Sequence, residues 1–81
     1  MPYYAYILVS ETTGRRYFGS CEDIEKRLAE HNAGKVRSSK AYRPYCILYY
    51  EIYESRGEAF AREKYFKTVD GYRYLKEKGI I

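Results

Sequence analysis

The chain has few of the residues that cross-link or clamp small domains. It has 81 residues, with only two cysteines and one histidine. Cys21 and Cys46 are too few for a disulfide framework, and with His31 they cannot supply the four ligands of a structural zinc site. We therefore expect reduced thiols and a fold that its hydrophobic core must hold, near the lower size limit for such a domain.

Long apolar runs and targeting signals are also missing. The longest apolar stretch, residues 45–50, is too short to span a bilayer. The first residues lack the basic segment and apolar core of a secretory signal. The sequence has no repeat or low-complexity linker, so we expect one domain over residues 1–81. We expect it to be soluble and cytoplasmic, with no membrane partner.

Tyrosine and positive charge are abundant instead. Twelve residues are tyrosine, so much of the core carries hydroxyl groups that must find partners or reach the surface. The formal net charge of +4 permits a polyanionic partner without requiring one. Between Gly34 and Pro44 the basic residues have no acidic neighbour, and this segment is predicted to be a loop. An ordinary solvated loop and a phosphate-binding loop explain it equally well.

The apolar pattern predicts an α+β fold with the order β-β-α-β-α-α. A turn at Thr13-Gly14 makes the first two strands a hairpin, Gly34 caps the first helix, and Ser55 with Glu58 forms a capping box at the second. We expect Asp70-Gly71 to interrupt the helical pattern before the last helix. The predicted strands are 3–9, 16–19 and 45–53, and the predicted helices are 23–32, 55–67 and 72–78. Together they indicate a three-stranded, mainly antiparallel sheet flanked by helices.

A carboxylate falls on the predicted buried face of the second helix. At ~100° per residue, Ala59, Glu63 and Phe66 project within about 60° of one another, with Phe60 close beside them. Burying an ionised carboxylate costs about 3 kcal/mol unless a cation or hydrogen bonds compensate its charge. A salt bridge at the rim of the core is the ordinary explanation of Glu63, and a bound metal ion is the other.

Two further polar residues border the core on the first helix. Arg27 and His31 are one turn apart, and both project within ~60° of Ile24. Taken singly, Arg27 would be a surface residue with a buried stem, and His31 a structural histidine. If the two helices cover the same face of the sheet, these groups and Glu63 can surround one cleft.

The polar residues and two aromatic tripeptides together resemble the motif of the GIY-YIG nuclease family. The tripeptides are Tyr4-Ala5-Tyr6 and Tyr17-Phe18-Gly19, followed at family-like spacings by Arg27, His31 and Glu63. The resemblance covers residues 3–67, including the pattern RLAEHNAG at 27–34. It is closest to the small stand-alone members, which are similar to a nuclease domain of the bacterial excinuclease.

The chain departs from the family pattern in two respects. Tyr4, Ala5 and Phe18 replace the glycine and isoleucines of the family name, and none of these positions carries chemistry. Some members add an asparagine late in the domain, and none follows Lys67 here. We therefore expect residues 72–81 to serve packing, with an oligomer contact as the lesser alternative.

The resemblance implies a metal-dependent DNA endonuclease that hydrolyses phosphodiester bonds with little sequence specificity, with DNA repair or recombination as its setting. Tyr17, with Tyr6 close by, would activate or orient the attacking water. Arg27 would lower the pKa of Tyr17 and bind the phosphate, and His31 would relay a proton or bond the phosphate. Glu63 would hold one Mg²⁺, or Mn²⁺, because such ions keep most of their waters and need few protein ligands.

The remaining expectations concern the partner and the motif glycine. Gly19 would allow a close approach where the second strand ends. DNA phosphates would meet basic residues on the surface, giving affinity that carries little sequence information. These residues are Arg16, Lys35, Arg37, Lys40 and Arg43.

Two alternatives remain open. One is a nucleic-acid-binding module that cleaves only with a larger DNA-targeting partner, or not at all. The other is a structural or homodimerisation domain whose polar residues form a core network.

Overall fold

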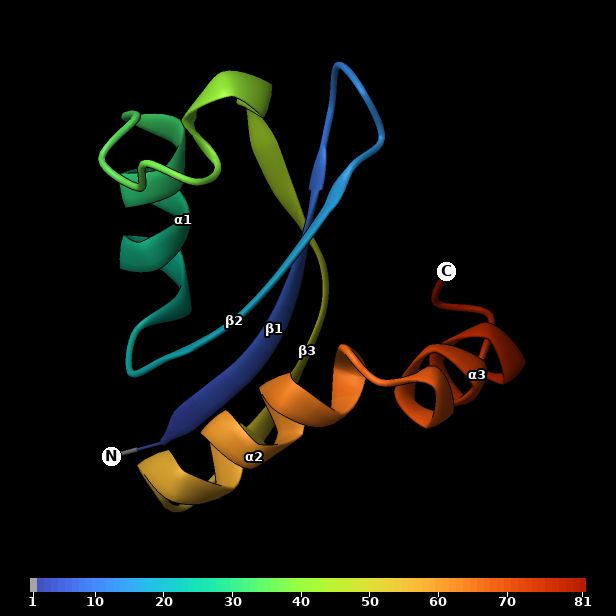
Figure 1. Ribbon diagram of the computed structural model, residues 1–81. Coiled ribbons are helices and arrows are strands. Elements are labelled where there is room, and N and C mark those ends of the chain that lie inside the picture. The colour runs from blue at the N-terminus through green and yellow to red at the C-terminus, as the bar shows by residue number, and fades with distance from the viewer. Residues whose placement is uncertain (1) are drawn as a thin grey trace.

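The computed structural model describes residues 2–81. The predicted α+β class and the order β-β-α-β-α-α are confirmed (Figure 1). A short 3₁₀ helix, Lys40–Tyr42, precedes the third strand. The elements are β1 (Tyr3–Ser10), β2 (Arg16–Cys21), α1 (Ile24–Asn32), β3 (Tyr45–Tyr53), α2 (Arg56–Phe66) and α3 (Val69–Glu77).

The sheet has β1 at its centre and β2 and β3 as its edges. Both strand pairs are antiparallel, so the sheet is antiparallel throughout. In the β1–β2 register Tyr6 lies opposite Gly19 and Leu8 opposite Tyr17. Four consecutive β1 residues, 5–8, are buried. A strand that is buried on both faces requires cover on both faces, and the helices provide it.

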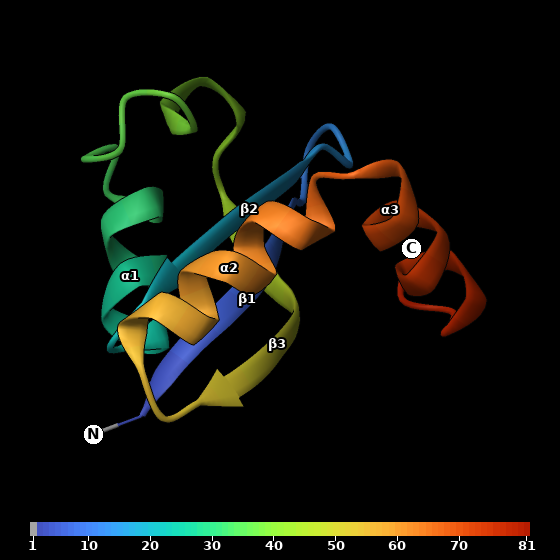
Figure 2. The ribbon, with the colours of Figure 1, turned by 60° about the horizontal axis from the view of Figure 1, so that its bottom comes forward.

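The helices divide between the two faces of the sheet. Alternation along β1 directs Tyr6 and Leu8 toward α1, where Ile24 and Leu28 pack against them. Ala5 and Ile7 point the other way and pack with residues of α2 and α3. The condition that α1 and α2 share a face is therefore not met, because central β1 needs an apolar partner on each side. Figure 2 shows β2 passing between the two helices.

Local capping signals place most helix ends correctly. The hydroxyl of Ser55 accepts the backbone N–H of Glu58, which confirms the predicted capping box at the start of α2. Gly34 follows the end of α1 with φ of +78°, as expected for a C-terminal cap. Phe60, expected beside the buried face of α2, is 51% exposed. It lies ~100° around the helix from Ala59, outside the buried stripe.

The expected break at Asp70-Gly71 is wrong, because α3 begins at Val69. The hydroxyl of Thr68 accepts the backbone N–H of Gly71 and caps this helix. Gly71 packs against the end of α2, where a side chain would overlap the Tyr65 carbonyl. Leu75 is buried, and Ile80 and Ile81 pack on the same core, so the expected packing role of this region is confirmed. No helix within residues 2–81 is long and apolar enough to cross a membrane.

Candidate active site at the edge of β2

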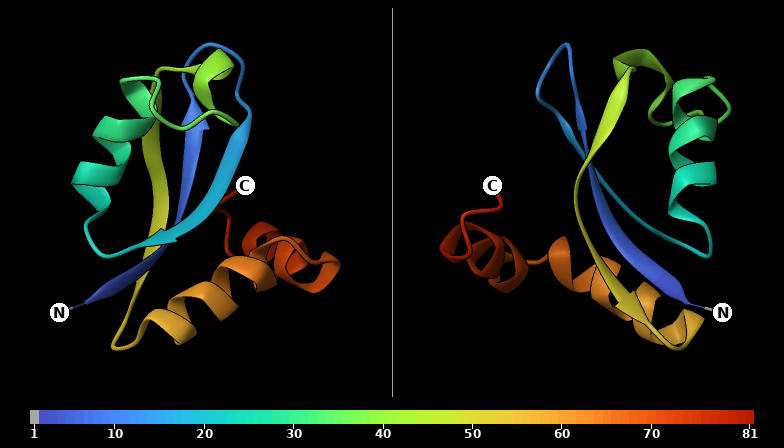
Figure 3. Two further views of the ribbon diagram at one scale, coloured as in Figure 1. Left: turned by 60° about the vertical axis from the view of Figure 1, so that its left-hand side comes forward. Right: turned by 180° about the vertical axis from the view of Figure 1, so that it is seen from behind.

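The predicted site residues gather along β2, the free edge strand between α1 and α2. Tyr17 and Gly19 share the face that α1 covers, while Ser20 points toward α2. Figure 3 shows this edge from the side, with α1 and α2 flanking the strand. Because residues in a strand rise ~3.3 Å each, Tyr17 and Ser20 lie about 10 Å apart along β2. Groups from the two faces can therefore meet only around this edge.

The motif glycine makes room for the first motif tyrosine. Tyr6 is 1% exposed, and its ring lies across Gly19 of the neighbouring strand. A side chain at position 19 would overlap the phenol of Tyr6. The close approach expected at Gly19 is therefore confirmed, and the group that approaches is the Tyr6 side chain.

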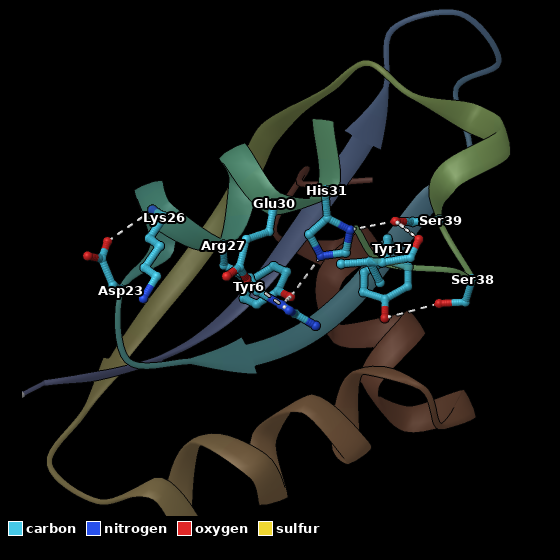
Figure 4. Close-up of polar contacts among 10 residues, drawn as sticks. Tyr6, Tyr17, Asp23, Lys26, Arg27, Glu30, His31, Ser38 and Ser39 are labelled. Carbon is cyan, nitrogen blue, oxygen red and sulfur yellow. Dashed lines mark hydrogen bonds and ion pairs between the residues drawn. The ribbon is translucent and has the colours of Figure 1, made fainter. Parts of the chain in front are cut away.

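Four side chains on the α1 face form one continuous hydrogen-bonded chain (Figure 4). The Arg27 Nε–H donates to the Tyr6 hydroxyl oxygen at 3.4 Å. The Tyr6 hydroxyl lies 3.2 Å from Nε2 of His31, whose Nδ1 is 2.6 Å from Oγ of Ser39. His31 and Ser39 are fully buried, whereas Arg27 is 36% exposed and pairs with Glu30 at 3.0 Å. The chain thus leads from the interior to a partly exposed cation.

Burial keeps the middle of this chain neutral. It raises the pKa of Tyr6 to about 12, although the adjacent Arg27 opposes the shift. Burial, reinforced by the positive charge of Arg27, lowers the pKa of His31 to about 4. At neutral pH Tyr6 therefore keeps its proton and His31 is an uncharged imidazole.

The second motif tyrosine is more accessible than the first. The Tyr17 ring packs edge-on against His31 with a centroid distance of 4.6 Å. Its hydroxyl accepts a hydrogen bond from the exposed Ser38 at 3.4 Å. Tyr6 is thus fully buried, whereas Tyr17 is half-buried and its hydroxyl bonds an exposed residue.

Glu63 lies on the opposite side of β2 from the hydrogen-bonded chain of Arg27, Tyr6, His31 and Ser39. Its side chain is 14% exposed, and its carboxylate accepts hydrogen bonds from Ser20 Oγ at 2.9 Å and Lys67 Nζ at 3.0 Å. The predicted salt bridge at the rim of the core is present, and Lys67 supplies its cation. Arg27, on the other face of the sheet, pairs with Glu30.

The groups around Glu63 suit a hard cation better than a soft one. A carboxylate and a hydroxyl offer oxygen ligands, and Mg²⁺ often takes only one or two protein carboxylates. Within residues 2–81, no three His, Cys, Asp or Glu side chains cluster as a ligand set. The donors therefore fit a sparsely held Mg²⁺ or Mn²⁺ ion, with Lys67 occupying one carboxylate oxygen.

The basic residues of the loop lie beside the Tyr17 side of the site. Lys35, Arg37, Lys40 and Arg43 are all exposed, and the last three line a shallow hollow of about 450 Å³. Arg43 also packs over Gly34. Arg16 is exposed at the start of β2, but alternation directs it to the face opposite Tyr17.

Sequence reasoning missed the three serines that hold the site residues. Ser20 was detectable in principle, because strand alternation directs its side chain to the α2 face of the sheet, away from the face of Gly19. Ser38 and Ser39 lie in an irregular segment that has no periodicity, so no sequence pattern relates them to Tyr17 or His31.

Comparison with known proteins identifies the family. The model of the GIY-YIG catalytic domain matches residues 2–74. The chain belongs to the GIY-YIG family. The resemblance inferred from the two tripeptides and the later polar residues is thereby confirmed, and GIY-YIG is a nuclease family.

The chain is also similar to small proteins of the UPF0213 group. The UPF0213 proteins SpyM50708 and SpyM3_1077, from Streptococcus pyogenes serotypes M5 and M3, are each 43% identical over 65 residues. The match covers 78% of this chain and 71% of each of those proteins. The solution NMR structure of the UPF0213 protein BH0048 from Bacillus halodurans matches 95% of this chain and 84% of its own, with 25% identity and a TM-score of 0.54. This GIY-YIG chain therefore shares its fold with a small relative.

Proposed function

We propose that this GIY-YIG protein is a divalent-metal-dependent DNA endonuclease with little sequence specificity. The observation that carries the proposal is the hydrogen-bonded chain from Ser39 to Arg27. It ends in a partly exposed guanidinium at a free strand edge, and the half-buried Tyr17 packs against its His31 member. A cation oriented by buried groups is suited to stabilise the charge that develops on a phosphate.

The residues on the α1 side would bind and orient the reacting groups. Arg27 would contact a nonbridging phosphate oxygen while Tyr6 and Glu30 hold its side chain in place. Tyr17 would orient the attacking water through its accessible hydroxyl. Tyr6 would not accept a proton at neutral pH, because its pKa is raised to about 12 by burial. Its role would be to align Arg27 with His31.

Glu63 would hold the metal ion from the α2 side of β2, with Ser20 orienting its carboxylate. When bound, a divalent ion supplies charge stabilisation on the phosphate and lowers the pKa of a bound water. The basic residues around the loop hollow would contact the DNA backbone. Such contacts carry no base readout and weaken as salt concentration rises.

The test is a cleavage assay with matched carboxylate variants. Wild type, Glu63→Gln and Glu51→Gln would each be incubated with Mg²⁺ or Mn²⁺ and with single-stranded, duplex, flapped and branched DNA. Glu51 is a suitable control because it is also a shielded carboxylate that a cation and hydroxyl groups contact. We expect Glu63→Gln to retain DNA binding and lose cleavage, and Glu51→Gln to cut normally per folded molecule.

Three outcomes would contradict the proposal in different ways. If all three proteins give identical products, Glu63 has no catalytic role or the activity is contamination. If all three bind DNA and none cuts, the protein is a binding module in isolation. If Glu63→Gln loses fold stability with no metal-dependent phenotype, the polar residues form a structural network. Circular dichroism and DNA titration of the same samples distinguish these results.

A further inference from the structure

Ser39 links the basic loop to the core of the candidate site. It is fully buried although it lies in an irregular segment, and its backbone carbonyl accepts the Tyr45 hydroxyl at 3.0 Å. Its backbone N–H donates to the Val36 carbonyl at 3.2 Å. Its hydroxyl lies 2.6 Å from Nδ1 of His31. Ser39 is thus held from its backbone while its side chain faces the imidazole.

The directions of the neighbouring hydrogen bonds determine where the imidazole proton lies. Arg27 can only donate, so the Tyr6 oxygen is the acceptor of that bond. Within residues 2–81, the Tyr6 hydroxyl proton then has one protein acceptor, Nε2 of His31. A neutral imidazole that accepts at Nε2 carries its proton on Nδ1. Nδ1–H donates to Ser39, whose own hydroxyl donates to the Val36 carbonyl at 3.4 Å.

We propose that Ser39 is a positioning residue that, together with Tyr6, holds His31 in the Nδ1–H tautomer and thereby couples the basic loop to the site. In the other tautomer His31 would donate to Tyr6, and the Tyr6 proton would lose its acceptor. Ser39 therefore acts through His31 and Tyr6 on the orientation of Arg27. The catalytic part of this inference depends on the proposed nuclease function, and the tautomer does not.

The same loop contains the residues expected to meet a polyanion. Ser38 hydrogen-bonds to Tyr17, and Ser39 hydrogen-bonds to His31. The basic residues that line the adjacent hollow are Arg37, Lys40 and Arg43. A phosphate backbone bound in this hollow would therefore contact the segment that orients both His31 and Tyr17. DNA binding and alignment of the site are thus functions of one short stretch of chain.

Nitrogen NMR of the imidazole tests the tautomer without any activity measurement. His31 is the only histidine, so its two ring-nitrogen signals are unambiguous. At pH 7 we expect a protonated Nδ1 and an unprotonated Nε2 in the wild type. Ser39→Ala should weaken that preference, because the buried Nδ1–H loses its acceptor while Tyr6 still donates to Nε2. A wild-type Nε2–H tautomer, or the wild-type ratio of the two tautomers in Ser39→Ala, would overturn the inference.

Ser10→Ala is the matched control for the loss of a buried hydroxyl. Ser10 is 3% exposed, and its hydroxyl donates to the Tyr42 carbonyl at 2.5 Å, so it anchors the same loop without touching His31. We expect Ser10→Ala to keep the wild-type tautomer. If both variants shift the imidazole signals equally, general loosening of the loop explains the effect and the specific role of Ser39 is wrong.

Cleavage kinetics test the catalytic part. We expect Ser39→Ala to lower kcat about tenfold, with KM changed less than about twofold. This is less than the roughly 100-fold or more that a proton-transfer group contributes, because Ser39 acts only through other residues. Ser39→Thr, which retains the hydroxyl, should recover most of kcat. If Ser39→Ala cuts at the wild-type rate while Glu63→Gln does not cut, the positioning role fails and the proposed function stands. If the wild type cuts no substrate, the proposed function and the catalytic part both fail, and the NMR result still decides the tautomer.

Discussion

Two polar networks lie on opposite faces of the sheet, and they differ in how they end. The α1-face network runs through Arg27, Tyr6, His31 and Ser39, as described above. The α2-face network centres on Glu51, which accepts Arg62 Nε–H at 2.7 Å. Each network contains at least one tyrosine, an arginine and shielded polar atoms. Their difference indicates which of them serves chemistry and which serves stability.

The α2-face network is closed on itself. Tyr49 and Tyr53 also donate to the Glu51 carboxylate, at 2.5 and 2.6 Å. Arg62 packs over the rings of Tyr65 and Tyr74, 4.6 Å from each centroid. Burial opposes ionisation of Glu51, but its hydrogen bonds to Arg62 and the two tyrosines outweigh burial and lower its pKa. Both charges are satisfied internally, so nothing remains to bind a substrate.

The α1-face network is open at one end. Its buried members are neutral, and its cation, Arg27, is partly exposed and pairs with the partly exposed Glu30 of the same helix. Shielded polar residues alone therefore do not identify a site in this protein. The informative feature is a chain of neutral hydrogen bonds that leads from the core to a usable charge.

The largest expected effect is on the closed network. Arg62→Ala should lower the free energy of unfolding by about 3 kcal/mol, because it leaves Glu51 without its cation and removes the packing on two rings. Cleavage per folded molecule should not change. Urea denaturation and the cleavage assay measure the two quantities, and Arg73→Ala, at a 67% exposed side chain, is the control. If folded Arg62→Ala lost cleavage activity, the assignment of the α2-face network to stability alone would be wrong.

The open network should show the reverse pattern. Arg27→Ala should reduce the cleavage rate about 100-fold, as expected for loss of a charge that stabilises the transition state. Its stability should change by less than about 1 kcal/mol, because the pair with Glu30 is a partly exposed helical pair. Arg56→Ala, which removes another surface pair, is the control. Equal cleavage by Arg27→Ala and wild type would exclude Arg27 from catalysis.

The two networks should also differ in how their contributions to stability depend on pH. The unfolded chain binds the His31 proton near pH 6.5, while the native protein binds it only near pH 4. The unfolded state carries more protons between these values, so stability should fall as pH falls, by about 2 kcal/mol at pH 5. The pKa of Glu51 is lowered, so its contribution should persist to lower pH. Denaturation from pH 7 to 5 checks this, and His31→Gln should flatten the profile.

Much of the fold was predictable because local signals agree with the tertiary structure. Alternating β1 residues pack on opposite faces, and the caps at Ser55 and Gly34 function as the sequence indicates. The start of α3 was not predictable, since Gly71 is required by its contact with the Tyr65 carbonyl. Local propensity interprets such a glycine as a breaker, although packing places it inside a helix.

The site was predictable in its charged and aromatic members and not in its serines. Tyr6, Tyr17, Arg27, His31 and Glu63 follow from spacing and family resemblance, although their catalytic roles remain predictions. Sequence reasoning placed Arg27, His31 and Glu63 around one cleft on the condition that their helices share a face, and the structure instead divides them around the edge of β2. Ser39 escaped prediction because its partner His31 is reached through an irregular loop, which no periodic pattern describes.

The smallest expected effect concerns the cation that pairs with Glu63. Lys67 is 52% exposed and one turn along the helix, so Lys67→Ala should change stability by less than about 0.5 kcal/mol. Removing this competing charge should favour metal binding. The Mg²⁺ concentration for half-maximal cleavage should therefore fall about twofold, because an interaction of about 0.5 kcal/mol corresponds to a twofold change in metal affinity. A Mg²⁺ titration measures it, with Lys64→Ala as the control on the same helix. A rise in the required Mg²⁺ would instead assign Lys67 to substrate binding, which would extend the open network around the edge of β2.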